Sequence, residues 1–298
     1  MKGLLVGIIF ILNITIVNAE SYDDRFKQLQ GKSPEQAKEL FSKWEKANPK
    51  SADVLLLKST FLFSHSRKED VKPDPKKAAN AAPVPLRASY DTKKAMAAIK
   101  ILETAKRKHA NRLDIYFGLA FMYQELGKFD LQYKSLETAV KLVKKSPGKL
   151  LWKDNKKPEK VLKLVPVLLM DYMSNYQAIP GKKSDQRFLK LANLAVKNFP
   201  KNVEPLNTIA GFYYGKKDWG NALTYLKKAH TLNKKDCIVL GNLANVYEAQ
   251  KDLTNAKTHL NSIVKTCKNP EVVKQAKLSL KNLDQESKGA KSEPTKKK

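Results

Sequence analysis

The chain has 298 residues and a formal net charge of +28 at pH 7. Its composition, 42% hydrophobic and 29% charged, is ordinary for a folded protein. Helix-forming residues dominate, and glycine is scarce, which argues against a β-sheet protein.

The first 19 residues are typical of a secretory signal. Lys2 gives a positive start, residues 3–17 are nearly all apolar, and small or modest residues precede Glu20. The apolar run is shorter than the roughly 20 residues of a membrane-spanning helix. We therefore expect cleavage near Ala19 and export, to a periplasm or the medium. An uncleaved N-terminal anchor is the alternative. No later stretch is apolar enough to span a bilayer.

The next segments suggest an incomplete first unit. Residues 20–32 are polar, and we expect a loosely ordered lead-in. Ser33 caps a helix whose first turn holds Pro34, and Gln36 closes a capping box. That helix buries three residues, and a second helix is predicted over 52–64. The buried residues are Ala37, Phe41 and Trp44.

A proline-rich insertion then interrupts the pattern. Residues 67–90 contain four prolines, which forbid a long helix, so we predict an inserted flexible loop. The helical pattern resumes at 91–109 with one apolar stripe. We interpret this helix as the delayed partner of 52–64.

Further helical pairs follow. Residues 113–147 form a repeat with a turn at Gly127, and 147–160 is a basic linker containing Trp152. A long apolar helix is predicted over 161–179, where Pro166 either kinks it or marks its start. Its partner spans 185–199.

Residues 203–270 repeat themselves with a shift of 34 residues. Asp218 and Asp252 occupy the same place before a second helix, as N-caps. A final helix opens at Asn269 with one polar face, as the end of a repeat array requires. The lysine-rich tail, 286–298, should be disordered. The matching pairs are Leu206/Leu240, Ile209/Leu243, Ala210/Ala244, Tyr213/Tyr247, Asn221/Asn255, Ala222/Ala256 and Leu226/Leu260.

A 34-residue period with two helices per period resembles the tetratricopeptide (TPR) family. The resemblance covers roughly residues 33–283, with three good matches beginning at Leu113, Val203 and Cys237. It implies an all-α fold, a right-handed α-solenoid of TPR-like helix-turn-helix repeats with a C-terminal capping helix. We place this solenoid at 33–285.

The two cysteines stand at the ends of one predicted hairpin. Cys237 begins the first helix of the last repeat, and Cys267 ends the second. Antiparallel helices bring these ends together, and export permits oxidation. We predict a disulfide, with two free thiols as the alternative.

The sequence offers no catalytic constellation and no cofactor motif. None of the four histidines has close metal-ligand spacing, and no phosphate-binding glycine loop or nucleophile motif occurs. We therefore expect a protein that is not an enzyme and that has neither metal nor cofactor. The histidines are His65, His109, His230 and His259.

The first helices offer a candidate partner-binding groove. Successive residues of a helix are rotated by about 100°. In the Leu113 repeat, this rotation places Phe117, Phe121 and Gln124 on one stripe, beside the face that packs within the hairpin. The TPR resemblance implies that first helices line a concave groove for a peptide or a partner protein. The alternative is that Phe117 and Phe121 pack against the neighbouring unit or under the inserted loop. The predicted groove residues are Phe117, Phe121, Gln124, Asn207, Tyr214, Asn245 and Glu248.

The lysine surplus suggests a second interpretation. Lysines scattered over helices commonly lie on solvent-exposed faces and have no further role. They can also attract anionic surfaces such as phospholipid or acidic polysaccharide. Specific nucleic-acid recognition favours arginine, which is rare here. An exported scaffold that binds a peptide in its groove is the main hypothesis, and a basic adaptor on an anionic envelope surface is the alternative.

Overall fold

The computed structural model describes residues 20–68, 88–177 and 181–292, with side chains up to residue 285. This part of the chain is almost entirely helical, and its only β-type contacts are two isolated bridges. The α-helices are α1 (Tyr22–Leu29), α2 (Pro34–Ala47), α3 (Ala52–Ser64), α5 (Thr92–Lys108), α6 (Leu113–Glu125), α7 (Phe129–Lys145), α8 (Val161–Gln177), α9 (Lys182–Asn198), α10 (Val203–Gly215), α11 (Trp219–Leu232), α12 (Cys237–Ala249), α13 (Leu253–Thr266) and α14 (Pro270–Ser292).

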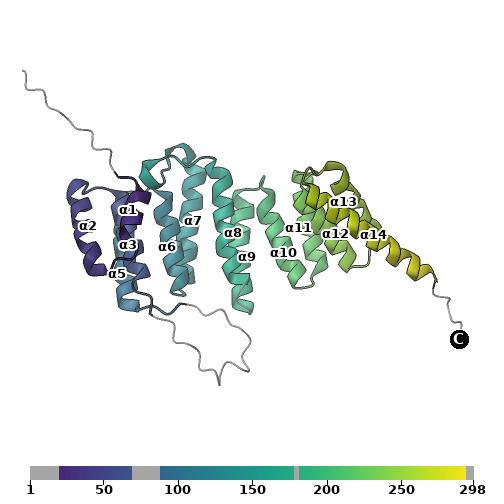
Figure 1. Ribbon diagram of the computed structural model, residues 1–298, viewed down its shortest axis with the longest axis horizontal. Coiled ribbons are helices and arrows are strands. Elements are labelled where there is room, and N and C mark those ends of the chain that lie inside the picture. Colours follow the sequence, from purple (N-terminus) through teal and green to yellow (C-terminus); the bar gives the residue numbers. More distant parts are fainter. Residues whose placement is uncertain (1–19, 69–87, 178–180, 293–298) are drawn as a thin grey trace, which may run out of the picture.

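The helices form a row of hairpins along the long axis of the molecule (Figure 1). Sequential helices pack as the pairs α3/α5, α6/α7, α8/α9, α10/α11 and α12/α13, and α14 covers α13. Each pair also contacts the next, which makes the array continuous. The predicted all-α repeat fold with a terminal capping helix is therefore confirmed, and so is the pairing of α3 with α5 across the insertion.

Local sequence accounts for how these hairpins begin and turn. Asp218 accepts a hydrogen bond from the backbone of Asn221, and Asp252 accepts one from Asn255, as the predicted N-caps. The turn between helices needs a left-handed residue, which is Gly127 (φ 69°) in one hairpin and Lys217 (φ 58°) in another. The predicted capping box at Ser33 is also present.

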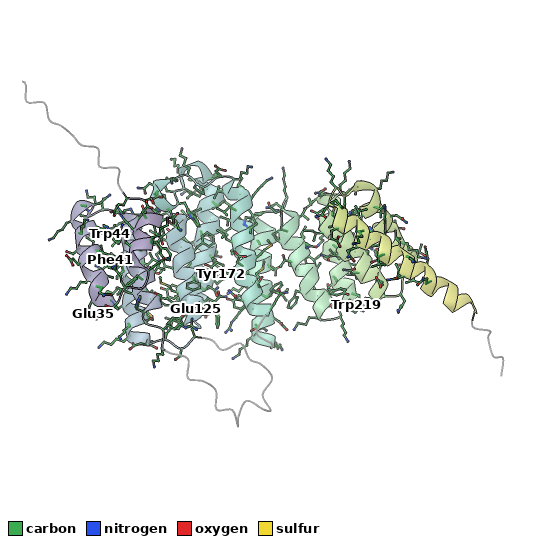
Figure 2. The ribbon with its side chains drawn as sticks, viewed as in Figure 1. Glu35, Phe41, Trp44, Glu125, Tyr172 and Trp219 are labelled. Carbon is green, nitrogen blue, oxygen red and sulfur yellow. A yellow bond between two sulfur atoms is a disulfide. The ribbon has the colours of Figure 1, made fainter. Side chains whose placement is uncertain are left out.

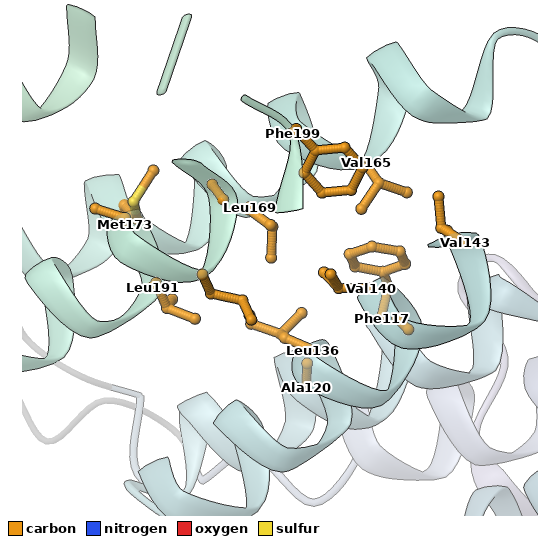
Figure 3. Close-up of a cluster of buried hydrophobic side chains, with 14 of the residues drawn as sticks. Phe117, Ala120, Leu136, Val140, Val143, Val165, Leu169, Met173, Leu191 and Phe199 are labelled. Atoms are coloured by element: carbon orange, nitrogen blue, oxygen red, sulfur yellow. The ribbon is translucent and has the colours of Figure 1, made fainter. Parts of the chain in front are cut away.

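The core consists of three neighbouring clusters of buried side chains. One joins α1 to α6, the central one joins α6 to α10, and the last joins α10 to α14. Helices α6 and α10 each contribute to two clusters, so no unit has a core of its own. Figure 3 shows part of the central cluster, where Phe117 and Phe199 meet aliphatic side chains from neighbouring helices. This dependence of each unit on its neighbours is characteristic of a solenoid.

The lead-in predicted over 20–32 is partly helical instead. Helix α1 is capped by Ser21 and carries two aspartates in its first turn, which favours helix formation. It packs against α3 and buries Tyr22 and Leu29. Burial, with the nearby carboxylates of Asp114 and Asp53, raises the pKa of Tyr22 to about 12. These two apolar residues fix a segment that composition alone suggests to be loose.

The insertion is closed at its base by a short antiparallel bridge between Arg67 and Tyr90. The backbone N–H of Lys68 donates to the carbonyl of Ser89, and that of Asp91 donates to Ser66, each over 2.7 Å. The rest of the predicted loop, 69–87, lies outside the described residues.

The basic linker at 147–160 packs across the end of the first helices. Leu150 is buried, and Trp152 lies against Phe117, with ring centroids 5.9 Å apart. Asn155 accepts a hydrogen bond from Arg112, which is itself buried. Helix α8 begins before Pro166 and includes it, so this proline does not mark the helix start.

The C-terminal end holds the predicted disulfide between Cys237 and Cys267, with Cα atoms 6.0 Å apart. Helix α14 continues to Ser292, so the tail is helical beyond residue 286, where we expected disorder to begin. Lysine, glutamate and alanine in this stretch are good helix formers, which lets the helix extend. Residues 1–19 and 293–298, where the signal and the last part of the tail are predicted, lie outside the described residues.

Candidate partner-binding face

The first helices of four hairpins, α6, α8, α10 and α12, alternate with the second helices along the array (Figure 1). They carry all of the residues predicted to line a groove. Direct packing joins α8 to α10 and α10 to α12, so these helices present a shared surface. The structure buries two of the predicted residues on α6, Phe117 and Gln124, and leaves Phe121 and the predicted residues of α10 and α12 at least partly accessible.

Phe117 and Gln124 are covered by the next unit, which corrects their prediction as groove residues. Phe117 is only 7% exposed, and its backbone carbonyl accepts a 2.7 Å hydrogen bond from the hydroxyl of Tyr172. Gln124 is 4% exposed and accepts a 3.1 Å hydrogen bond from the side chain of Asn175. Tyr172 lies in the middle of the array (Figure 2). Phe117 and Gln124 therefore lie on the part of α6 that α8 covers.

Phe121 stays accessible, with 47% of its surface exposed. Its ring meets the edge of Phe63 from α3, with centroids 6.3 Å apart. It is therefore supported on one side by the preceding unit. Phe121 does not line the pocket between α10 and α12.

A pocket of about 70 Å³ lies between α10 and α12. Two of the predicted residues, Tyr214 and Asn245, line it, together with Gly211 and Asn242. Tyr214 is 40% exposed, and its ring packs on Trp219 with centroids 5.1 Å apart. Gly211 leaves the surface open, because a Cβ atom built there has no neighbour within 4 Å. A small uncharged hollow bordered by amides and one aromatic ring suits an apolar side chain of a bound chain and its backbone.

Asparagine side chains connect the two helices beside this pocket. Nδ2 of Asn242 donates a 2.7 Å hydrogen bond to Oδ1 of the predicted residue Asn207. This bond fixes the orientation of both amides and leaves a donor on Asn207 and an acceptor on Asn242. The last predicted residue, Glu248, is exposed on α12. The face defined by Asn207, Gly211, Tyr214, Asn242 and Asn245 is called the α10–α12 face below.

Sequence reasoning missed Asn242 at this face. The repeat aligns Asn242 with Thr208, so this position carries a polar side chain in both helices. That recurrence was a usable signal.

A second missed group is the buried set of Arg112, Asp53 and Asp114, in which both aspartates occupy the second position of a first helix.

The buried side chains of Arg112, Asp53 and Asp114 have a structural role. Arg112 is 1% exposed and bonds both carboxylates. Burial raises the pKa of Asp114, and the adjacent guanidinium of Arg112 opposes that shift. Across residues 20–68, 88–177 and 181–292, no group of three His, Cys, Asp or Glu side chains is placed to hold a metal ion. In the same ranges, no helix combines the length and apolarity needed to cross a membrane.

The described helices and this face define the molecule as an all-α helical repeat protein. No protein-family model matches the sequence, and no curated protein does. Among solved structures, the chain is similar to YrrB, described as a TPR protein with an unusual peptide-binding site. That match has 11% identity and a TM-score of 0.38, and it covers 80% of this chain and 97% of YrrB.

Two further solved structures are similar at the same level. TTC0263, a thermophilic TPR protein of Thermus thermophilus, has 16% identity and a TM-score of 0.37, covering 63% of this chain and 92% of its own. PilF of Pseudomonas aeruginosa has 10% identity and a TM-score of 0.37, covering 87% and 97%. The fold assignment rests on the helix pairs of this chain itself.

Proposed function

We propose that this protein is a non-catalytic scaffold that binds an extended segment of a partner protein on the α10–α12 face. The observation that carries the proposal is the pocket between α10 and α12, which is uncharged, accessible and bordered by oriented asparagine amides. An apolar side chain of the partner would enter the pocket, and the amides would bond its backbone. We further propose that the protein works outside the cytoplasm after loss of residues 1–19.

A peptide-display selection on residues 20–298 tests the proposal. Peptides would be selected on the wild type in high salt, which screens the general attraction of a basic protein for acidic chains. The selected peptides would then be measured against Gly211→Gln. This change fills the pocket without a steric conflict at Cβ and replaces a helical glycine with a better helix former.

Gly220→Gln is the matched control, because Gly220 is an exposed helical glycine of α11 outside the pocket. Peptides that bind the wild type and Gly220→Gln but lose affinity for Gly211→Gln support the proposal. Equal binding to all three proteins contradicts it. If the high-salt selection yields no peptide and a parallel selection at low salt yields only acidic peptides, the result would instead support the basic adaptor on an anionic surface.

A further inference from the structure

A second, chemically different pocket lies among α7, α8 and α9, and it shares no lining residue with the α10–α12 face. Its volume is about 350 Å³. Its lining residues come from the turn before α7 and the start of that helix, from Tyr176 near the end of α8, and from Arg187 to Leu191 of α9. Its charged lining residues are Lys128, Asp130, Arg187 and Lys190.

Aromatic rings hold two of these cations in place. The guanidinium carbon of Arg187 lies 3.5 Å from the ring centroid of Phe129, and Nζ of Lys190 lies 4.1 Å from that of Tyr133. No carboxylate in the described part of the chain forms an ion pair with Arg187 or Lys190. A guanidinium stacked on a ring keeps its N–H edge available for the paired oxygens of a phosphate or carboxylate.

The start of α7 adds to the same field. Lys128 has the backbone conformation of the two capping aspartates, with φ −87° and ψ 63° against φ −88° and ψ 75° at Asp218. A lysine cannot accept the hydrogen bonds that an aspartate accepts there, and α7 has no side-chain cap. The first N–H groups of α7 therefore reinforce the positive potential that the cations create.

The balance of charge indicates the class of ligand. Three cationic side chains stand against the one carboxylate of Asp130, which leaves a surplus of two positive charges. A phosphomonoester carries about −1.5 to −2 charges at pH 7 and presents three acceptor oxygens. We propose that this pocket binds a phosphomonoester, with Arg187 bonding two phosphate oxygens and Lys190 and Lys128 completing the charge balance.

Calorimetric titration of the full mature chain with phenyl phosphate at pH 7 tests the site. We expect saturable binding that Arg187→Gln weakens about tenfold or more, because a charge-assisted fork is lost. Arg107→Gln is the matched control, since Arg107 is an exposed arginine of α5 outside the pocket. It removes the same charge and should change the affinity by less than about twofold, as expected of a distant screened charge.

Lys128→Asp separates loss of binding from loss of folding. It restores the aspartate cap found in α11 and α13, so the midpoint of thermal unfolding should rise while phenyl phosphate binding is lost. A second titration with phosphatidylcholine vesicles containing phosphatidic acid identifies the source of the group. Binding of phenyl phosphate alone assigns a small ligand, and vesicle binding that also requires Arg187 assigns a lipid headgroup. The proposal is overturned if neither probe binds, or if Arg187→Gln and Arg107→Gln weaken binding equally.

Discussion

Nη2 of Arg112 donates a 2.7 Å hydrogen bond to Oδ1 of Asp53, although the two residues are 59 positions apart in the chain. The same nitrogen bonds Asp114, and Nη1 bonds Asn155 of the linker. One buried guanidinium thus joins α3, α6 and residues 147–160.

Replacing Arg112 by methionine should lower the free energy of unfolding by about 3–5 kcal/mol, because two buried carboxylates lose their counter-charge. Urea unfolding followed by circular dichroism measures the loss. Arg107→Met, at an exposed site, should cost less than about 0.5 kcal/mol. A similar cost for both changes would show that the buried ion pairs of Arg112 with Asp53 and Asp114 do not stabilise the fold.

Phe117 and Phe121 should respond very differently to truncation, although both belong to α6. Phe117→Ala removes a side chain from the central core and should cost about 3–5 kcal/mol. Phe121→Ala removes a half-exposed ring and should cost about 1 kcal/mol or less. Chemical denaturation of both variants compares them, and equal losses would contradict the burial of Phe117 beneath α8.

Lys217→Gly should stabilise the protein by about 0.5–1 kcal/mol. Lys217 has a left-handed conformation (φ 58°), which costs a residue with a side chain about 1–2 kcal/mol. Glycine removes this cost, but part of the gain is offset because glycine has more conformational entropy in the unfolded chain. Gln250→Gly is the control, because Gln250 has φ −85° and gains nothing from glycine. Thermal unfolding distinguishes the two, and destabilisation by Lys217→Gly would contradict the prediction.

Removing the disulfide should destabilise the C-terminal hairpin. Cys237 and Cys267 are separated by 30 residues. A loop of that size corresponds to about 3.5 kcal/mol in the chain-entropy account. Replacing both cysteines with serine should reproduce the effect of reducing the wild type. Hydrogen exchange of α12 and α13 locates the change, and unaltered exchange there would argue against a stabilising bridge.

His259 should make the stability of the C-terminal hairpin of α12 and α13 sensitive to acid. Burial lowers the pKa of His259, and the charges of His230 and Lys227 lower it further. The unfolded chain then binds more protons than the folded one, so this contribution to stability is present above about pH 6.5 and is lost as the pH falls through the folded pKa.

Unfolding of the wild type and of His259→Gln at pH 7.5 and pH 5.5 tests this effect. The wild type should lose more stability on acidification than the variant does. The pKa of His109 is shifted in the same direction and contributes equally to both proteins. Identical losses in the two proteins would show that His259 is not responsible.

Much of the fold could be predicted because its signals are local. The match of Leu206 with Leu240 gives the period, Asp218 and Asp252 mark helix starts, and the two cysteines stand at the ends of one hairpin. Each of these features depends on residues within a single repeat or its immediate neighbour. The same reasoning located Tyr214 and Asn245, which line the pocket between α10 and α12.

Only the tertiary structure decided which stripe of a first helix stays accessible. Helical periodicity identifies the face of α6 that packs within its own hairpin, but ten residues of this helix are buried, because both neighbouring units cover it. Whether Phe117 faces a partner or a neighbour depends on how Tyr172 of α8 reaches across to it. Arg112 meets Asp53 for the same reason. The stacking of units brings together side chains from different repeats, and no period within one repeat encodes that contact.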